Sequence, residues 1–91
     1  MQTLDIVGLA SPFYMPNAVK VSSGNVLTFD NVDGNHHTVT SVHSGTLQHN
    51  DKFDSGILGP GDKFEVTLDE KGTYDYFCAL HAGMTGIIIV E

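Results

Sequence analysis

The sequence of 91 residues predicts an all-β protein folded as a two-sheet sandwich or a small barrel. No window keeps the apolar spacing of an α-helix over three turns, whereas period-2 alternation of apolar and polar residues recurs along the chain. Clusters of Gly, Asn, Asp and Pro separate these short segments. This pattern indicates six or seven short strands. They should form a single domain over residues 1–91, because a chain of this length holds one hydrophobic core.

The first half of the chain contains three predicted β segments. Residues 19–21 and 27–29 alternate in polarity on either side of the turn cluster at 22–25, so we expect them to form a hairpin. A second turn cluster at 31–35 contains Asp-Gly, a strong turn signal. Residues 37–42 then resume an alternation rich in β-branched side chains, which favours a strand.

The second half begins with a polar, irregular stretch at residues 43–55, for which we expect a long loop with at most a short helical turn. Residues 64–68 alternate again and present one apolar face. Residues 74–78 form the next predicted strand, after a Lys-Gly turn. Residues 86–90 are almost uniformly apolar, which indicates a central strand covered on both faces.

Composition and charge exclude several classes of partner. Hydrophobic residues make up 41% of the chain and charged residues 16%, as in folded globular proteins. Eleven acidic residues face only four basic ones, so the net charge of -7 disfavours nucleic acid and anionic membranes. The longest apolar run is too short for membrane insertion. We expect a monomer whose acidic surface keeps it dispersed and favours a basic protein partner.

The beginning of the chain and its cysteine content bear on the cellular compartment. The first residues show no basic region followed by a long apolar run, so no signal peptide is recognisable. The chain is therefore either cytosolic or the mature form of an exported protein. We expect the second, a periplasmic or otherwise extracytoplasmic protein that has lost its leader. A single cysteine rules out an intrachain disulfide, so packing or a bound ligand must stabilise the domain.

Three potential metal donors follow one another near the end of the chain. Cys78, His81 and Met84 supply a thiol, an imidazole and a thioether at spacings of three residues, between two predicted strands. A lone cysteine is more often a buried, inert residue. Core packing, however, gives no reason for His81 and Met84 to follow at these spacings, and we therefore interpret the segment as a metal-binding turn.

The donor types favour copper. A thiolate with a thioether suits copper, and a thiolate with two imidazoles gives a trigonal blue-copper arrangement with a weak axial methionine. A structural zinc site would need further cysteines, which the chain lacks. His37, at the start of a β-rich segment, is the best candidate for the second imidazole. Its neighbour His36 is the competing candidate, whereas His43 and His49 lie in the polar stretch and are expected to be solvated.

Several strings along nearly the whole chain carry a family resemblance. They are Phe29-Asp30-Asn31-Val32-Asp33, His37-Thr38-Val39-Thr40, Phe53-Asp54-Ser55-Gly56, Gly59-Pro60-Gly61 and the segment from Gly72 through Gly86. These strings resemble the cupredoxins of the plastocyanin, amicyanin and pseudoazurin group. The resemblance implies a Greek-key β-sandwich of about seven or eight strands in two sheets that holds one copper ion, cycling between Cu(I) and Cu(II).

The resemblance also implies a role for each site residue. His37, Cys78 and His81 would be the equatorial ligands and Met84 the axial ligand. Thr38 occupies the position beside the first ligand that helps to tie the two ligand loops together.

An electron carrier that is not an enzyme is the function that this resemblance implies. Redox partner proteins would dock on a small apolar patch around His81. The residues expected to form this patch are Ala79, Leu80, Ala82 and Gly83, with Met15 or Pro60 nearby. Two alternatives stay open. One is a copper oxidoreductase that acts on a small molecule such as a nitrogen oxide at an open axial position, and the other is a copper-binding or delivery protein.

Overall fold

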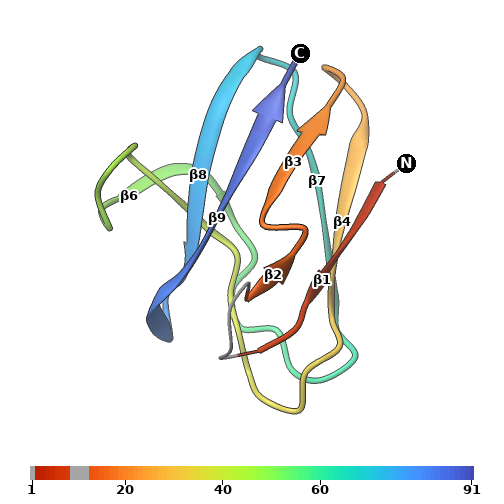
Figure 1. Cartoon of the computed structure of the whole chain (residues 1–91), viewed down its shortest axis with the longest axis vertical. Helices are drawn as coiled ribbons and strands as arrows, with labels where there is room; N and C mark the ends of the chain where they lie inside the picture. Colours follow the sequence, from red (N-terminus) through yellow and green to blue (C-terminus); the bar gives the residue numbers. More distant parts are fainter. Residues whose placement is uncertain (1, 9–12) are drawn as a thin grey trace.

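The computed structural model describes residues 2–8 and 13–91, apart from the side chain of Ala82, and the described residues form two β-sheets (Figure 1). The strands are β1 (Gln2–Ile6), β2 (Tyr14–Met15), β3 (Ala18–Val21), β4 (Val26–Asn31), β5 (Thr40–Val42), β6 (His49–Asp54), β7 (Lys63–Thr67), β8 (Gly72–Cys78) and β9 (His81–Val90). One sheet has the order β2-β1-β4-β7 and the other the order β3-β9-β8-β5-β6. The prediction of an all-β, two-sheet fold is confirmed. Nowhere in these residues is there a helix with the length and hydropathy of a membrane span.

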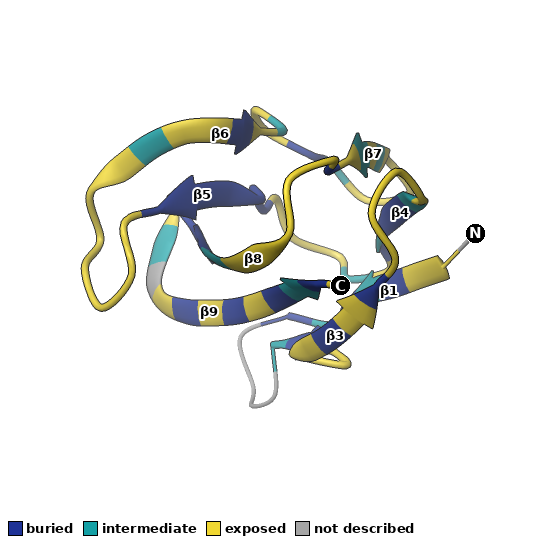
Figure 2. Cartoon of the chain, turned by 90° about the horizontal axis from the view of Figure 1, so that it is seen from above, coloured by how far each residue is buried: buried dark blue, intermediate teal, exposed yellow. Residues whose placement is uncertain are grey.

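The hydrophobic core lies between the two sheets, and alternate residues of β3 and β9 face it, as the banded colouring of these strands in Figure 2 shows. Its centre is a cluster of aromatic rings in which Tyr76 packs edge-on against Tyr14 and Phe29, with ring centroids 4.8 Å and 5.3 Å away. Gly86 pairs with Tyr76 across the β8–β9 ladder. A Cβ atom at Gly86 would overlap the Tyr76 side chain, so the missing side chain makes room for this ring.

The predicted hairpin of residues 19–21 and 27–29 is wrong. β3 pairs in parallel with β9, whereas β4 pairs with β1 and β7, so the turn between β3 and β4 carries the chain from one sheet to the other. Both strands direct their apolar residues into the same core from opposite sides. Alternation specifies which face of a strand is buried but not which strand pairs with it.

Two further expectations need correction. The predicted loop at 43–55 contains β6, which is polar because it is the edge strand of its sheet and most of its side chains are exposed. β9 is central, between β3 and β8, as predicted. Its outer face is only partly covered, however, because Ile87 keeps 38% of its surface exposed.

The pairing of β5 with β8 positions the residues that carry the chemistry. Thr40 lies opposite Phe77, which places the connection before β5 beside the end of β8. The connection from β4 is fixed by Asn31, which is fully buried. The Asn31 side-chain amide donates to the carbonyl oxygens of Asn35 and Leu58, 2.9 Å and 3.0 Å away. The loop that contains the first predicted ligand is therefore anchored at both ends.

Candidate metal centre

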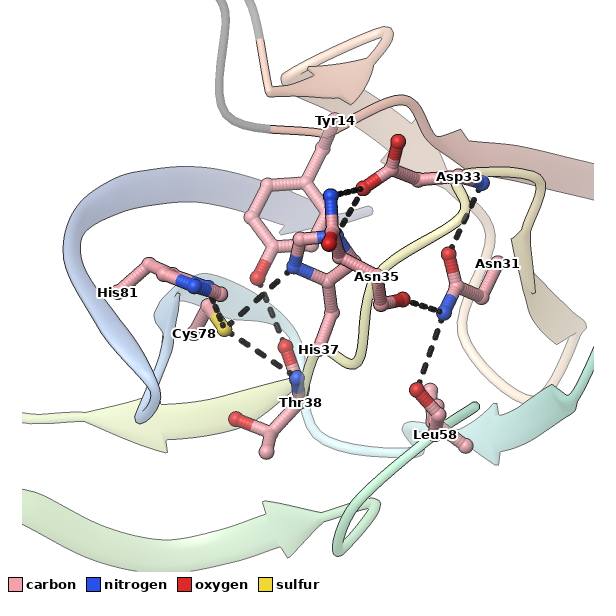
Figure 3. Close-up of polar contacts among 9 residues, drawn as sticks. All are labelled: Tyr14, Asn31, Asp33, Asn35, His37, Thr38, Leu58, Cys78 and His81. Atoms are coloured by element: carbon pink, nitrogen blue, oxygen red, sulfur yellow. Dashed lines mark hydrogen bonds and ion pairs between the residues drawn. The ribbon is translucent and has the colours of Figure 1, made fainter. Parts of the chain in front are cut away.

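Three of the predicted ligands come together at one end of the sandwich (Figure 3). One donor atom from each of His37, Cys78 and His81 lies within 4.8 Å of the other two. The Cys78 Sγ atom is 3.9 Å from His37 Nδ1 and 3.5 Å from His81 Nδ1. His37 and Cys78 are completely buried, whereas His81 is half-buried. In the described part of the chain, this is the one cluster of three His, Cys, Asp or Glu donors.

Two features of the backbone bring these residues together. Cys78 is the last residue of β8 and His81 the first of β9, so the turn between them contains only Ala79 and Leu80. His37 is held by a pair of backbone hydrogen bonds with Leu58, in which each N–H donates to the other carbonyl, at 3.0 Å and 2.7 Å. The metal-binding turn is thus tighter than the sequence suggested, because β9 begins at His81 rather than at residue 86.

The sulfur atom of Cys78 accepts a backbone hydrogen bond. The N–H of Thr38 points at Sγ over 3.3 Å, in a fully buried position. Thr38 is itself fixed on both sides, because its carbonyl accepts a hydrogen bond from the Tyr14 hydroxyl at 2.8 Å and its Oγ1 accepts one from the Ala79 N–H at 2.7 Å. The predicted role of Thr38 in joining the two ligand loops is visible in these contacts. An N–H directed at sulfur offers the positive end of a dipole to a thiolate ligand.

Asp33 orients the ring of His37. The Oδ2 atom of Asp33 lies 2.7 Å from His37 Nε2, and because a carboxylate only accepts, the ring nitrogen is the donor. The other ring nitrogen, Nδ1, is then left without a proton and faces Cys78 Sγ, ready to bind a metal. The hydrogen bond from His37 is the main cause that holds the pKa of Asp33 below its ordinary value, against the opposing effect of partial burial.

Asp33 is a functional residue that the sequence did not reveal. It belongs to the Asp-Gly turn, and turn formation alone accounts for an aspartate there. The one feature of the sequence that could have indicated this contact is the position of Asp33 four residues before His37. In a loop, however, residues four apart do not have a fixed distance between their side chains.

Met84 is buried within the core. Only 1% of its surface is exposed, and it belongs to the same cluster of buried side chains as Cys78. It lies on β9, three residues beyond His81. A thioether is therefore enclosed in the same hydrophobic core as the Cys78 thiol.

The remaining histidines lie outside the cluster. His36 is exposed, and its Nε2 atom lies beside Gly59. His43 and His49 are also exposed, and the ring of His49 packs edge-on against Phe77, with centroids 5.6 Å apart. The choice of His37 over its neighbour agrees with this geometry.

The donor set fits a copper ion. A divalent metal with bond lengths near 2.0 Å to nitrogen and 2.3 Å to sulfur separates these donors by about 3.5–3.7 Å at tetrahedral to trigonal angles. The distances from Cys78 Sγ to the two imidazole nitrogens, 3.5 Å and 3.9 Å, bracket that range. One thiolate, two imidazoles and a nearby thioether match the preference of type 1 copper. Fold and donor set together define a small β-sandwich protein with one mononuclear copper site.

Comparison with known proteins agrees. Residues 7–91 match the family of copper binding proteins described as the plastocyanin/azurin family. Plastocyanin of Cucumis sativus is 33% identical over 88 residues and that of Mercurialis perennis 36% over 86 residues, each match covering 86% of this chain and 87% of the relative. The chain belongs to the plastocyanin/azurin family of copper-binding proteins.

Solved structures show the same fold. A purple cupredoxin from Nitrosopumilus maritimus superposes with a TM-score of 0.92 at 25% identity, with 100% of both chains covered. A reduced amicyanin variant superposes with a TM-score of 0.79 at 26% identity, covering 98% of this chain and 80% of amicyanin. The resemblance seen in the sequence is confirmed, including its cupredoxin fold.

Proposed function

We propose that this protein carries single electrons between redox partners by means of one copper ion bound to His37, Cys78, His81 and Met84. The observation that carries the proposal is the convergence of one sulfur and two imidazole nitrogens within 4.8 Å. When bound there, copper supplies the one-electron change between Cu(II) and Cu(I). The imidazoles and the thiolate would be the strong ligands, and the Met84 thioether the weak axial one.

The hydrogen bonds around the site support rapid electron transfer. The His37 ring is held by Asp33, the sulfur of Cys78 by the Thr38 N–H, and the His37 backbone by Leu58. Side chains fixed in this way keep nearly the same positions in both oxidation states. Little reorganisation then accompanies each transfer, which is what a carrier requires.

We place the route of electron exchange at His81. It is the one strong-ligand side chain of the three that is not completely buried. Leu80 beside it is 47% exposed, and Met15 is 52% exposed. Gly83 and Pro60 are exposed too, whereas the side chain of Ala82, also expected in this patch, lies outside the described residues. An exposed apolar patch beside a redox ligand suits transient docking of a partner protein.

Complete burial of His37 and Cys78 supports retention of the metal more than its delivery to another protein. The burial of Met84 supports an occupied axial position more than an open one. We therefore propose a monomeric, single-domain carrier rather than an oxidoreductase or a delivery protein. We also propose an extracytoplasmic location, on the strength of the family resemblance, and cell fractionation with an antibody tests it.

The copper site is tested by titrating the pure apoprotein with Cu(II). We expect an intense visible band from thiolate-to-copper charge transfer at one equivalent, and its loss in Cys78→Ser. Absence of the band in the wild type refutes the copper assignment. Added small anions should leave the band unchanged, and a shift would instead favour the open-site oxidoreductase.

The docking patch is tested by the rate of electron self-exchange between the oxidised and reduced protein, measured by NMR line broadening. Leu80→Asp should slow the exchange without changing the copper spectrum. Leu47→Asp is the matched control, because Leu47 is 52% exposed and belongs to the connection between β5 and β6 rather than to the ligand turn. Equal rates in the two variants would contradict the proposed route.

A further inference from the structure

A row of hydrogen bonds connects the metal-binding turn to a carboxylate on the edge strand β6. The N–H of Ala79 donates to Thr38 Oγ1 at 2.7 Å, Thr38 Oγ1 lies 3.0 Å from Thr40 Oγ1, and Thr40 Oγ1 lies 3.2 Å from Asp54 Oδ1. Both threonines are buried, with 5% and 1% of their surfaces exposed. This row of hydrogen bonds therefore connects Ala79 to the exposed residue Asp54 through two buried threonine side chains.

Counting protons fixes the direction of every bond in this row. A carboxylate only accepts, so the single hydroxyl proton of Thr40 is used on Asp54. The contact between the two hydroxyls must then be a donation from Thr38 to Thr40. Thr38 Oγ1 has thereby used its proton and offers lone pairs to the Ala79 N–H. All three hydrogen bonds point away from the metal-binding turn and toward the negative charge.

We infer that Asp54 is a positioning residue for the copper site, acting through Thr40 and Thr38. The inference rests on the proposed copper-binding function. The Thr38 hydroxyl is held from both sides, because it must donate to Thr40 and accept from Ala79, and the carboxylate thereby fixes the direction of its proton. The backbone N–H of the same residue is the donor to Cys78 Sγ.

The charge of Asp54 also strengthens the row. A hydrogen bond that ends on an ion is stronger than a neutral one of the same geometry, and successive bonds polarise one another. Asp54 is itself held in place, because its Oδ1 atom also accepts the N–H of Gly56 at 3.0 Å. A negative charge favours the more positive oxidation state of the metal. Loss of this charge should therefore raise the reduction potential.

The first test cuts the row while leaving the charge in place. Thr40→Val has nearly the same shape but no hydroxyl, and Thr40→Ser keeps the hydroxyl as the matched control. We expect Thr40→Val to shift the reduction potential and the copper hyperfine splitting in the electron paramagnetic resonance spectrum, and Thr40→Ser to leave both near the wild-type values. Identical values for the wild type and Thr40→Val would overturn the inference.

The second test removes the charge while keeping the shape. Asp54→Asn is compared with Asp51→Asn, which removes an equal charge from the same strand at a residue outside the row. Asparagine also tolerates the positive φ of 60° at position 51. We expect a larger positive shift of the potential in Asp54→Asn, and equal shifts would count against a role for the row. Each variant must first form the visible copper band. If the wild type itself lacks that band, the proposed function fails instead.

Discussion

The two tyrosines at the centre of the core make a matched pair for testing the hydrogen-bond assignment. Tyr14 and Tyr76 are both fully buried, and their rings are in contact at 4.8 Å. The Tyr14 hydroxyl donates to the Thr38 carbonyl at 2.8 Å. The Tyr76 hydroxyl has no hydrogen-bond partner among residues 2–8 and 13–91. Changing either residue to phenylalanine removes one oxygen and keeps the ring, so the two variants differ only in what that oxygen contacts.

The expected changes in the free energy of unfolding have opposite signs. Tyr14→Phe leaves the buried Thr38 carbonyl without its partner and should destabilise the apoprotein by about 1–3 kcal/mol. Tyr76→Phe removes a hydroxyl whose burial without a partner costs about 1–3 kcal/mol, so it should be neutral or stabilising within that range. Equilibrium unfolding in urea, with both variants under the same conditions, measures the two changes.

A spectroscopic readout separates the site from general stability. Thr38 also donates to Cys78 Sγ, so Tyr14→Phe should shift the thiolate-to-copper band of the loaded protein, while Tyr76→Phe should not. Equal losses of stability in the two variants would contradict the assignment of a hydrogen-bond partner to Tyr14 alone. An unchanged band in Tyr14→Phe would contradict the inference that Tyr14 helps to position the Thr38 N–H at the sulfur.

Four further outcomes are expected. Asp33→Asn should weaken Cu(II) binding by about 10–100-fold in a chelator competition, because the orientation of the His37 ring depends on this partner. The folded-state pKa of Asp33 lies below the ordinary 3.8, so its contribution to stability is present above that value and is lost as the pH falls through the folded pKa, a loss that Asp33→Asn should lack in urea unfolding. Burial raises the pKa of both Tyr14 and Tyr76 above the ordinary 10.0, so the folded state keeps protons that the unfolded state releases. The stability that these two hydroxyls contribute should be constant below pH 10 and be lost above it, less steeply in Tyr76→Phe. Gly86→Ala should destabilise the protein by about 1–3 kcal/mol in thermal or urea unfolding, because its methyl group overlaps the Tyr76 side chain.

The chemistry of the site was more predictable from the sequence than the arrangement of the strands. Cys78, His81 and Met84 share one short segment, so their donor types and spacing were visible without knowledge of the fold. The pairing of strands depends on contacts between residues far apart in the sequence. The parallel pairing of β3 with β9 therefore had no local signal.

The residues that support the ligands were only partly predictable from the sequence. The role of Thr38 was predicted from the family resemblance. No role was predicted for Asp33 or Asp54, because aspartate is common in loops and on edge strands for reasons unrelated to metals. Each acquires its role only when the fold brings it beside His37 or Thr40. Supporting contacts of this kind can be recognised only from coordinates.

The three strong ligands are unequally anchored, and this predicts which one moves when copper binds. His37 is buried, its ring bonded to Asp33 and its backbone to Leu58, and Cys78 accepts the Thr38 N–H. The ring of His81 is half-buried at the end of a two-residue turn, and its one polar contact among the described side chains is with Cys78 Sγ.

We therefore expect the His81 ring of the apoprotein to reorient freely, while the His37 ring stays fixed. Side-chain NMR relaxation of the two imidazoles in the apoprotein and in the Cu(I) form measures this difference. Copper should slow the motion of the His81 ring and leave that of His37 unchanged. Equal mobility of both rings in the apoprotein would mean that the metal, rather than the hydrogen bonds of the 31–40 connection, positions the first ligand.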